Sequence, residues 1–276
     1  MENNNLTLQV LIAAMNETDF SLVENMNIKC DCIMANQTDN TLKDDFEIQG
    51  NKVKIINSAF VGLAANRNLA LENATADIVI FADDDMVYAD DMPEGVLGAF
   101  EKNPKADVII FSCTETNSEG EVITEYAHTN KRRTMFNSLK FPTYVIAAKR
   151  RSLKRKKIKF SQMFGSGSVY NFGEDTIFLA DCFKKGLKVY GSEFNIGTST
   201  KELHWFDGYT DEFFFNKGAL YRCIFGVLAP FYGLYFAKKY EKLSGVNKKS
   251  IYDNMEKGMD DYKGKMKFNN FNSTGL

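Results

Sequence analysis

The chain has 276 residues, 44% of them hydrophobic, which is enough apolar material for one large domain or for one domain with an appendage. Its formal net charge of −2 excludes a protein that holds nucleic acid by overall positive charge. Five cysteines and two histidines stand at spacings that fit neither a zinc site nor a redox pair, so we expect reduced, mostly buried thiols in a cytosolic protein. The polar residues 1–5 lack the basic start of a signal peptide.

In the first part of the chain, apolar runs typical of strands alternate with helical segments. The expected strands are Leu6–Ala13, Lys29–Ala35, Val53–Asn57, Ile78–Ala82 and Val108–Cys113. The expected helices are Asp19–Met26, Gly62–Glu72 and a segment that begins after Asp91, a residue suited to cap it. This alternation predicts an α/β fold with a mostly parallel sheet and helices on both faces.

The fourth of these strands carries the strongest functional signal. Ile78–Ala82 is uncharged and rich in β-branched residues, as in a strand that is buried on both faces. Three adjacent carboxylates follow it, Asp83, Asp84 and Asp85, at the end of the sheet where open α/β proteins bind ligands. Carboxylate oxygens suit Mg²⁺ or Mn²⁺, whereas the alternative interpretation is an ordinary acidic turn.

The middle of the chain is strongly basic. A hairpin is expected at Val122–Tyr126, and most of the positive charge that follows lies in Lys131–Arg133 and Lys149–Lys159. Two interpretations stand: a solvated loop face, or an electropositive rim that attracts a nucleotide, an anionic acceptor or anionic lipid. Beyond a flexible joint at Phe164–Ser168, Gly173-Glu174-Asp175 predicts a helix that ends at Gly186, and a short strand is expected from Leu187.

The C-terminal part reads as helix from Thr210 and is rich in Phe and Tyr. Cys223–Ala237 carries no charge but is too short to span a membrane, and three lysines follow it. A packed pair of helices is one interpretation. The other is an element that docks on a membrane, with aromatic side chains in lipid and lysines at the headgroups. Phe268–Leu276 is expected to be a tail.

Four stretches occur in an order that resembles the family 2 glycosyltransferases with the GT-A fold, over roughly Leu6 to Tyr221. They are the first strand with Asn16, the helix containing Asn66-Arg67-Asn68, the strand that ends in the acid triplet, and Gly173-Glu174-Asp175. Phe206–Tyr209 and Phe215–Gly218 also resemble a segment of the members that build bacterial capsules.

The resemblance implies roles for these residues. Asp83 and Asp85 take the outer positions of the family's Asp-x-Asp metal motif. Apart from the resemblance, His204 is a candidate third ligand from the C-terminal side, and the alternative is a structural histidine. Asp175, in the family's Glu-Asp motif with Glu174, is implied as the catalytic base; the alternative is that both acids simply cap a helix.

Residues at the ends of the first strands are implied in binding the nucleotide sugar. They are Ala14, Asn16, Asn36, Asp39, Arg67, Asp83 and Asp84. The family usually carries an acid in a serine-containing turn after its second strand, and here Asn36 or Asp39 stands in its place. Arg67 matches phosphate oxygens in its donor geometry, although a surface helix arginine is the alternative. Trp205 either stacks on a sugar or packs in the interior.

The resemblance therefore predicts a GT-A domain at residues 1–209, with a nucleotide-binding half to about 113 and an acceptor half beyond it, and a helical extension and tail at 210–276. The expected activity is metal-dependent, inverting transfer of a hexose from a UDP-sugar to a growing, lipid-linked surface polysaccharide, with Mg²⁺ or Mn²⁺ as cofactor. A cytoplasmic location is expected, and a peripheral contact with the inner membrane face and a homodimer are left open. The alternatives are a non-catalytic sugar- or membrane-binding relative and a nucleotidyltransferase.

Overall fold

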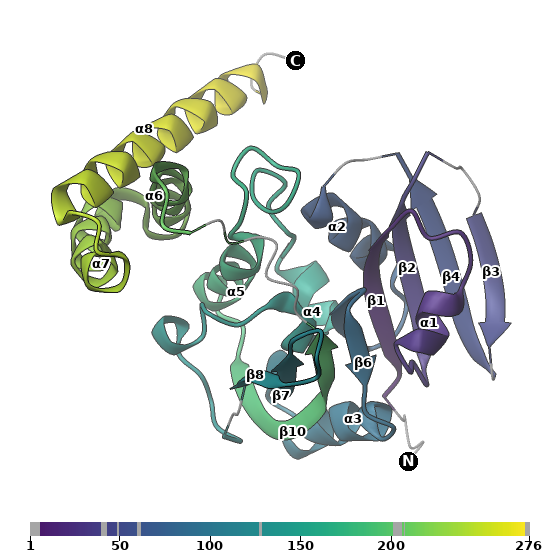
Figure 1. The fold of residues 1–276 in the computed structure, drawn as a ribbon. Helices are drawn as coiled ribbons and strands as arrows, with labels where there is room; N and C mark the ends of the chain where they lie inside the picture. The colour runs from purple at the N-terminus through teal and green to yellow at the C-terminus, as the bar shows by residue number, and fades with distance from the viewer. Residues whose placement is uncertain are drawn as a thin grey trace. The chain divides into compact units, whose positions relative to one another are not determined.

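The computed structural model describes residues 6–39, 43–48, 50–59, 62–126, 129–200, 206 and 208–273 (Figure 1). The chain divides into two compact units. Unit 1 consists of Met1–Ser168 and Glu174–Glu202, and unit 2 consists of Val169–Gly173 and Leu203–Leu276. The predicted joint Phe164–Ser168 lies in unit 1, and the segment that follows it, Val169–Gly173, belongs to unit 2.

Unit 1 is built on a mixed sheet whose strand order is β3-β4-β2-β1-β5-β9-β7-β10-β6, with β8 paired to β7. The strands are β1 Leu8–Met15, β2 Asp31–Gln37, β3 Lys43–Ile48, β4 Asn51–Ser58, β5 Ile78–Asp83, β6 Met86–Tyr88, β7 Val108–Thr116, β8 Val122–Tyr126, β9 Ile146–Lys149 and β10 Val189–Thr200. Strands β4, β2, β1 and β5 run parallel, as do β7 and β10. The predicted α/β class with a mostly parallel sheet is confirmed, although the antiparallel β9 separates β5 from β7.

Short helices connect these strands. They are α1 Ser21–Asn25, α2 Leu63–Asn73, α3 Met92–Lys102, α4 Arg150–Arg155, α5 Glu174–Lys184 and the 3₁₀ turns η1 Met135–Asn137 and η2 Thr143–Val145. Helix α2 packs on β1 and β2, and α3 packs against β10. The predicted helices after residues 62, 91 and 173 are therefore present.

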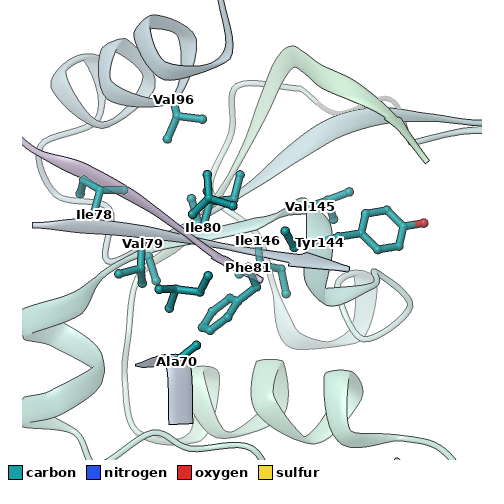
Figure 2. Packing of buried hydrophobic residues seen from close by; sticks show 14 of the residues in the cluster. Ala70, Ile78, Val79, Ile80, Phe81, Val96, Tyr144, Val145 and Ile146 are labelled. Atoms are coloured by element: carbon teal, nitrogen blue, oxygen red, sulfur yellow. The ribbon is translucent and has the colours of Figure 1, made fainter. Parts of the chain in front are cut away.

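Strand β5 lies in the centre of the core. Ile78, Val79, Ile80 and Phe81 are fully buried, and Figure 2 shows Val96 on one side of this strand and Ala70 on the other. The uncharged run is thus buried on both faces, as its sequence predicts. A strand held in this way fixes the position of the carboxylates that follow it.

Several sequence expectations for unit 1 are wrong, each for a local reason. The charged segment Lys43–Ile48 has weak strand propensity, yet it forms β3 by pairing antiparallel with β4 at the sheet edge. Part of the basic stretch expected as a loop is helix α4. Strand β10 runs on to Thr200 because it pairs with β7 through two irregularities that its Gly, Ser and Asn residues tolerate.

Unit 2 contains three helices in its described part, where a pair was expected: α6 Asp211–Phe225, α7 Ala229–Ser244 and α8 Lys248–Ser273, with the 3₁₀ turn η3 Gly226–Leu228 between the first two. The hydroxyl of Thr210 caps α6 by accepting the N–H of Phe213 at 3.1 Å. Helix α8 includes residues 268–273, which were expected as a tail, because no glycine or proline follows Gly264 within it to end the helix.

Helices α6 and α8 cross at very short range. A Cβ added at Gly218 would lie 1.9 Å from the carbonyl oxygen of Met255, and one added at Gly258 would lie 1.9 Å from that of Phe215. Only glycine allows this approach. Three of the five cysteines, Cys32, Cys113 and Cys182, are buried.

Candidate active site

The predicted site residues gather at one edge of the sheet, where the parallel strands β1, β2, β4 and β5 end. In the register of the sheet, Ala13 lies beside Asp83, Ala14 beside Asn36, and Asn36 beside Asn57. Parallel strands end at a common edge, so residues far apart in sequence become neighbours there. Asp84 is exposed in the turn between β5 and β6.

Arg67 of α2 is the centre of this edge. Its side chain is 1% exposed, and the guanidinium lies 2.6 Å from Asp83 Oδ1, 3.1 Å from Glu174 Oε1 and 2.7 Å from Asp175 Oδ1. It also sits over the ring of Phe160 at 5.4 Å. One buried cation therefore joins the acid at the end of β5 to the two acids that begin α5.

Burial lowers the pKa of Arg67, but Asp83, Asp175 and Glu174 together outweigh it and raise the pKa above its ordinary value. The burial of Arg67 excludes the alternative interpretation that it is an arginine on the exposed surface of its helix. In this structure the guanidinium points at protein carboxylates, and its contact with a nucleotide remains a prediction.

Asp85 hydrogen-bonds to the last two residues of β10. Its Oδ2 accepts the hydroxyl of Ser199 at 3.1 Å, and its carbonyl oxygen accepts the N–H of Thr200 at 3.1 Å. Its other carboxylate oxygen, Oδ1, is buried and has no hydrogen-bond partner. Burial, and then the charge of Asp83, raise the pKa of Asp85 to about 6.

An unpartnered buried carboxylate oxygen fits a cation. Such an oxygen costs free energy unless a donor or a cation approaches it. Asp83, Glu174 and Asp175 share the guanidinium of Arg67, and Asp84 and Asp85 follow Asp83 directly in the chain, so this edge carries an excess of negative charge. Among the described residues, no group of three or more His, Cys, Asp and Glu side chains is arranged to hold a metal. Phosphate oxygens and water would therefore have to complete the coordination of an ion there.

The two acids of the Glu-Asp motif are not equivalent. Glu174 is buried, and a Cβ on Gly165 would lie 3.0 Å from its carboxylate. Burial, and then Asp175, raise the pKa of Glu174 above its ordinary value, while Arg67 opposes them. Asp175 is more open, with 26% of its side chain exposed. Only Asp175 is open enough to meet an incoming hydroxyl.

Thr143 of η2 holds Asp175 in place. Its N–H donates to Asp175 Oδ2 at 3.2 Å, and its hydroxyl donates to Oδ1. With Arg67 these make three donors, and a carboxylate has about four lone-pair sites, so one position remains for another donor. The next residue, Tyr144, donates its hydroxyl to the buried Glu115 of β7, and Glu115 lies beside Ser199 in the sheet.

Asn36 and Asn16 shape the loops at the ends of β2 and β1. Both amide hydrogens of Asn36 are engaged, with the carbonyl of Glu17 at 2.7 Å and Oδ1 of Asn57 at 2.9 Å. Asn16 adopts a φ of 59° and donates its N–H to the carbonyl of Gln37 at 2.9 Å. Asp39 is exposed just beyond β2, so it is the acid there that is open to a ligand.

Sequence reasoning missed three residues of this edge: Thr143, Ser199 and Asn66. The amide of Asn66 donates to the carbonyl of Ala14 at 3.0 Å, which ties α2 to the end of β1. Thr143 and Ser199 follow no local motif, and only the pairing of distant strands brings them to the site. Asn66 was within reach of sequence reasoning because it stands next to Arg67.

Parts of the two basic stretches lie away from this edge. Lys149 pairs with Ile78, at the opposite end of β5 from Asp83, and Arg132 bridges to Tyr190 near the start of β10. The second stretch ends at Lys159, which forms an ion pair with Glu72 of α2, and an electropositive rim that attracts a nucleotide stays a prediction. The predicted ligand His204, together with Trp205, lies outside the described residues.

Comparisons with known proteins agree with this geometry. The family model described as Glycosyl transferase family 2 matches residues 8–160. Among solved structures, TarS residues 1–349 of S. aureus is similar, with a TM-score of 0.61 at 12% identity over 94% of this chain and 92% of that one. The same TarS fragment in complex with UDP-GlcNAc gives a TM-score of 0.60 at 14% identity, over 80% of this chain and 67% of that one.

No curated protein matches the chain. At these low identities the likeness to TarS shows the fold alone. It confirms the predicted GT-A-like architecture, with its mostly parallel sheet and C-terminal helices.

Proposed function

The chain belongs to glycosyl transferase family 2, and on this premise we propose that it transfers a hexose from a UDP-sugar to a growing, lipid-linked surface polysaccharide with inversion at the sugar carbon. The observation that carries the proposal is the convergence on Arg67 of Asp83 and the Glu174–Asp175 pair. It brings the two halves of a transfer site together: acids that face a diphosphate and an acid that faces an acceptor. TarS residues 1–349 have been solved in complex with UDP-GlcNAc and with UDP, which supports a UDP-linked donor for this chain.

A divalent cation, Mg²⁺ or Mn²⁺, belongs to this proposal. Asp85 would hold it through the unpartnered Oδ1, together with Asp83. When bound, such an ion supplies neutralising charge for the departing diphosphate. Ser199 keeps the Asp85 carboxylate oriented for this role through its hydrogen bond to Oδ2.

Asp175 acts as the general base. As the acceptor oxygen bonds to the anomeric carbon and the bond from that carbon to the diphosphate oxygen breaks, the acceptor's proton passes to Asp175. Attack on the face opposite the leaving group inverts the configuration, as it does in sugar hydrolysis with a single displacement. Arg67 and Thr143 fix the position of the carboxylate for this step through their hydrogen bonds to it.

The test is to follow the melting temperature of the full chain with UDP, with and without Mn²⁺, and then to screen UDP-hexoses for UDP release. A ligand that binds only the folded state raises the melting temperature in proportion to the logarithm of its concentration. We expect a UDP-dependent rise that Mn²⁺ enlarges, and Asp85→Asn should remove the Mn²⁺-dependent part. Asp90→Asn is the matched control, because that carboxylate is 83% exposed and pairs with Lys29 instead.

Each result bears on a separate part of the proposal. The absence of any Mn²⁺ effect would remove the cation. A shift with UDP but no release of UDP from any UDP-hexose, with membrane extract as the source of acceptor, would favour a non-catalytic sugar-binding relative.

A further inference from the structure

The turn between α6 and α7 in unit 2 exposes large apolar side chains. Phe231 is 76% exposed, Val227 84%, Leu228 60% and Tyr235 66%. We call Gly226–Tyr235 the hairpin tip. A contiguous group of this kind on a folded surface indicates that something covers it.

Helix α7 carries small residues on its buried face and several large apolar residues on its exposed face. Its buried residues are the small ones, Ala229, Gly233 and Ala237, which share one face. Gly233 is pressed so close to α8 that a Cβ there would lie 2.6 Å from the terminal methyl carbon of Met259. Phe231, Leu234 and Tyr235 are exposed on the outer side of this helix, where polar residues are usual.

The charge near this face is mainly positive. Between Phe213 and Tyr240 the sequence contains no Asp or Glu, and Lys238, Lys239 and Lys242 are exposed further along α7. One acid lies among these lysines, Glu241, whose carboxylate accepts the N–H of Lys248 at 2.9 Å. At about 1.5 Å per residue, Phe231 and Lys242 are roughly 16 Å apart along the helix. Aliphatic and Phe side chains come first, then Tyr235, then the lysines. This is the order of hydrocarbon, interface and anionic headgroup that a bilayer presents.

The helical stretch Asp211–Ser244 is long and apolar enough to cross a membrane by length and composition. It is not one continuous helix, however. Gly226, with a φ of 56°, and the turn η3 break it. Residues of both parts, including Phe214, Tyr221 and Ala237, pack in a hydrophobic cluster with Ile251 and Met255 of α8. Contacts within unit 2 thus cover one face of the stretch and leave the hairpin tip exposed.

We propose that the hairpin tip inserts into the surface of a bilayer containing anionic phospholipid, with Lys238, Lys239 and Lys242 at its headgroups. The proposal concerns unit 2 alone and is independent of the donor and cation chemistry of unit 1.

The test is co-sedimentation of the full chain with vesicles of phosphatidylcholine alone or of phosphatidylcholine mixed with phosphatidylglycerol. We expect binding to the mixed vesicles that weakens with salt, and much weaker binding to the neutral ones. The double variant Leu228→Ser/Phe231→Ser should lose at least about tenfold in binding to mixed vesicles. Lys238→Gln/Lys239→Gln/Lys242→Gln should lose about tenfold or more on mixed vesicles only.

The control is Val122→Ser/Phe136→Ser, because these side chains in unit 1 match the first pair in exposure, at 58% and 73%. The control should bind vesicles like the unchanged chain. All the altered side chains lie on the surface, so a melting curve will verify that each variant is folded.

Three results would overturn the proposal. One is equal vesicle binding by the tip variant and the control. Another is resistance of the bound protein to alkaline carbonate, which would indicate a spanning segment. The third is self-association in the absence of vesicles, seen by light scattering and abolished by Leu228→Ser/Phe231→Ser, which would assign the face to a second copy of the chain.

Discussion

Arg67 of unit 1 and Lys217 of unit 2 are both largely withdrawn from solvent, but their surroundings differ. Arg67 meets three carboxylates, which raise its pKa despite burial. Lys217 lies over aromatic rings, with its ammonium 4.7 Å from the ring centre of Phe172 and 5.3 Å from that of Phe213. Burial lowers the pKa of Lys217 to about 8. In the described part of the chain it forms no ion pair.

The contrast separates two uses of buried surface. In unit 1, three carboxylates surround Arg67, and further negative charge, with the unpartnered Oδ1 of Asp85, is concentrated at one edge of the sheet. In unit 2, aromatic side chains pack on the inner side, large apolar side chains remain exposed, and Lys217 has no ion pair among the described residues. The arrangement in unit 1 is typical of a catalytic site. The arrangement in unit 2 is typical of a surface that docks on a membrane.

The largest effect is expected from substitution of Asp175, the proposed general base. Asp175→Asn should lower kcat for transfer by about 10³-fold, because a neutral amide cannot take the proton from the acceptor. The affinity for UDP, measured by calorimetry, should change by less than about threefold, since the group acts in the transition state. Glu174→Gln is the matched control, with a loss of about tenfold, because its carboxylate is enclosed beside Arg67. Equal losses for the two variants would remove the assignment of Asp175 as base.

The second-largest effect is expected from removal of Arg67, the cation that is paired with carboxylates. Arg67→Met leaves Asp83, Glu174 and Asp175 without their partner, and we expect a loss of about 3 kcal/mol in the free energy of unfolding at pH 7. Arg67→Lys should lose less because it keeps the charge. Arg151→Met, on the exposed surface of α4, should fall within about 0.5 kcal/mol of the unchanged chain. Urea titration measures all three, and an Arg67→Met loss no larger than the Arg151→Met loss would contradict the central role of Arg67.

Removal of Lys217 should change the free energy of unfolding in the opposite direction and by the smallest amount. Lys217→Met should raise the free energy of unfolding by about 1 kcal/mol at pH 7, since the cost of burying the ammonium exceeds its attraction to the rings. The folded-state pKa lies below the ordinary value of 10.5. The cost is therefore fully present below pH 8 and disappears as the pH rises from 8 to 10.5.

The advantage of Lys217→Met should accordingly shrink between pH 8 and pH 10 in urea titrations, while Lys249→Met, an exposed position on α8, shows no such trend. A destabilised Lys217→Met variant at pH 7 would mean that the aromatic faces outweigh desolvation, and the contrast between the two cations would fail.

The sequence by itself determined the features that depend on local pattern. An uncharged run rich in β-branched residues is typical of a strand buried on both faces, so β5 and the position of Asp83, Asp84 and Asp85 at its end could be predicted. The start of α5 at Glu174 and the cap of α6 at Thr210 also follow from neighbouring residues. The family resemblance stated from these motifs agrees with the model that matches residues 8–160.

Only the tertiary structure decided which distant groups meet. The partners of Arg67 lie 16, 107 and 108 residues away, and Ser199 lies 114 residues from Asp85. Residue spacing gives the period of a helix or strand but not the element that packs against it. For the same reason, the outward position of Phe231 could not be predicted, because the close packing of Gly233 on α8 determines which face of α7 is inside.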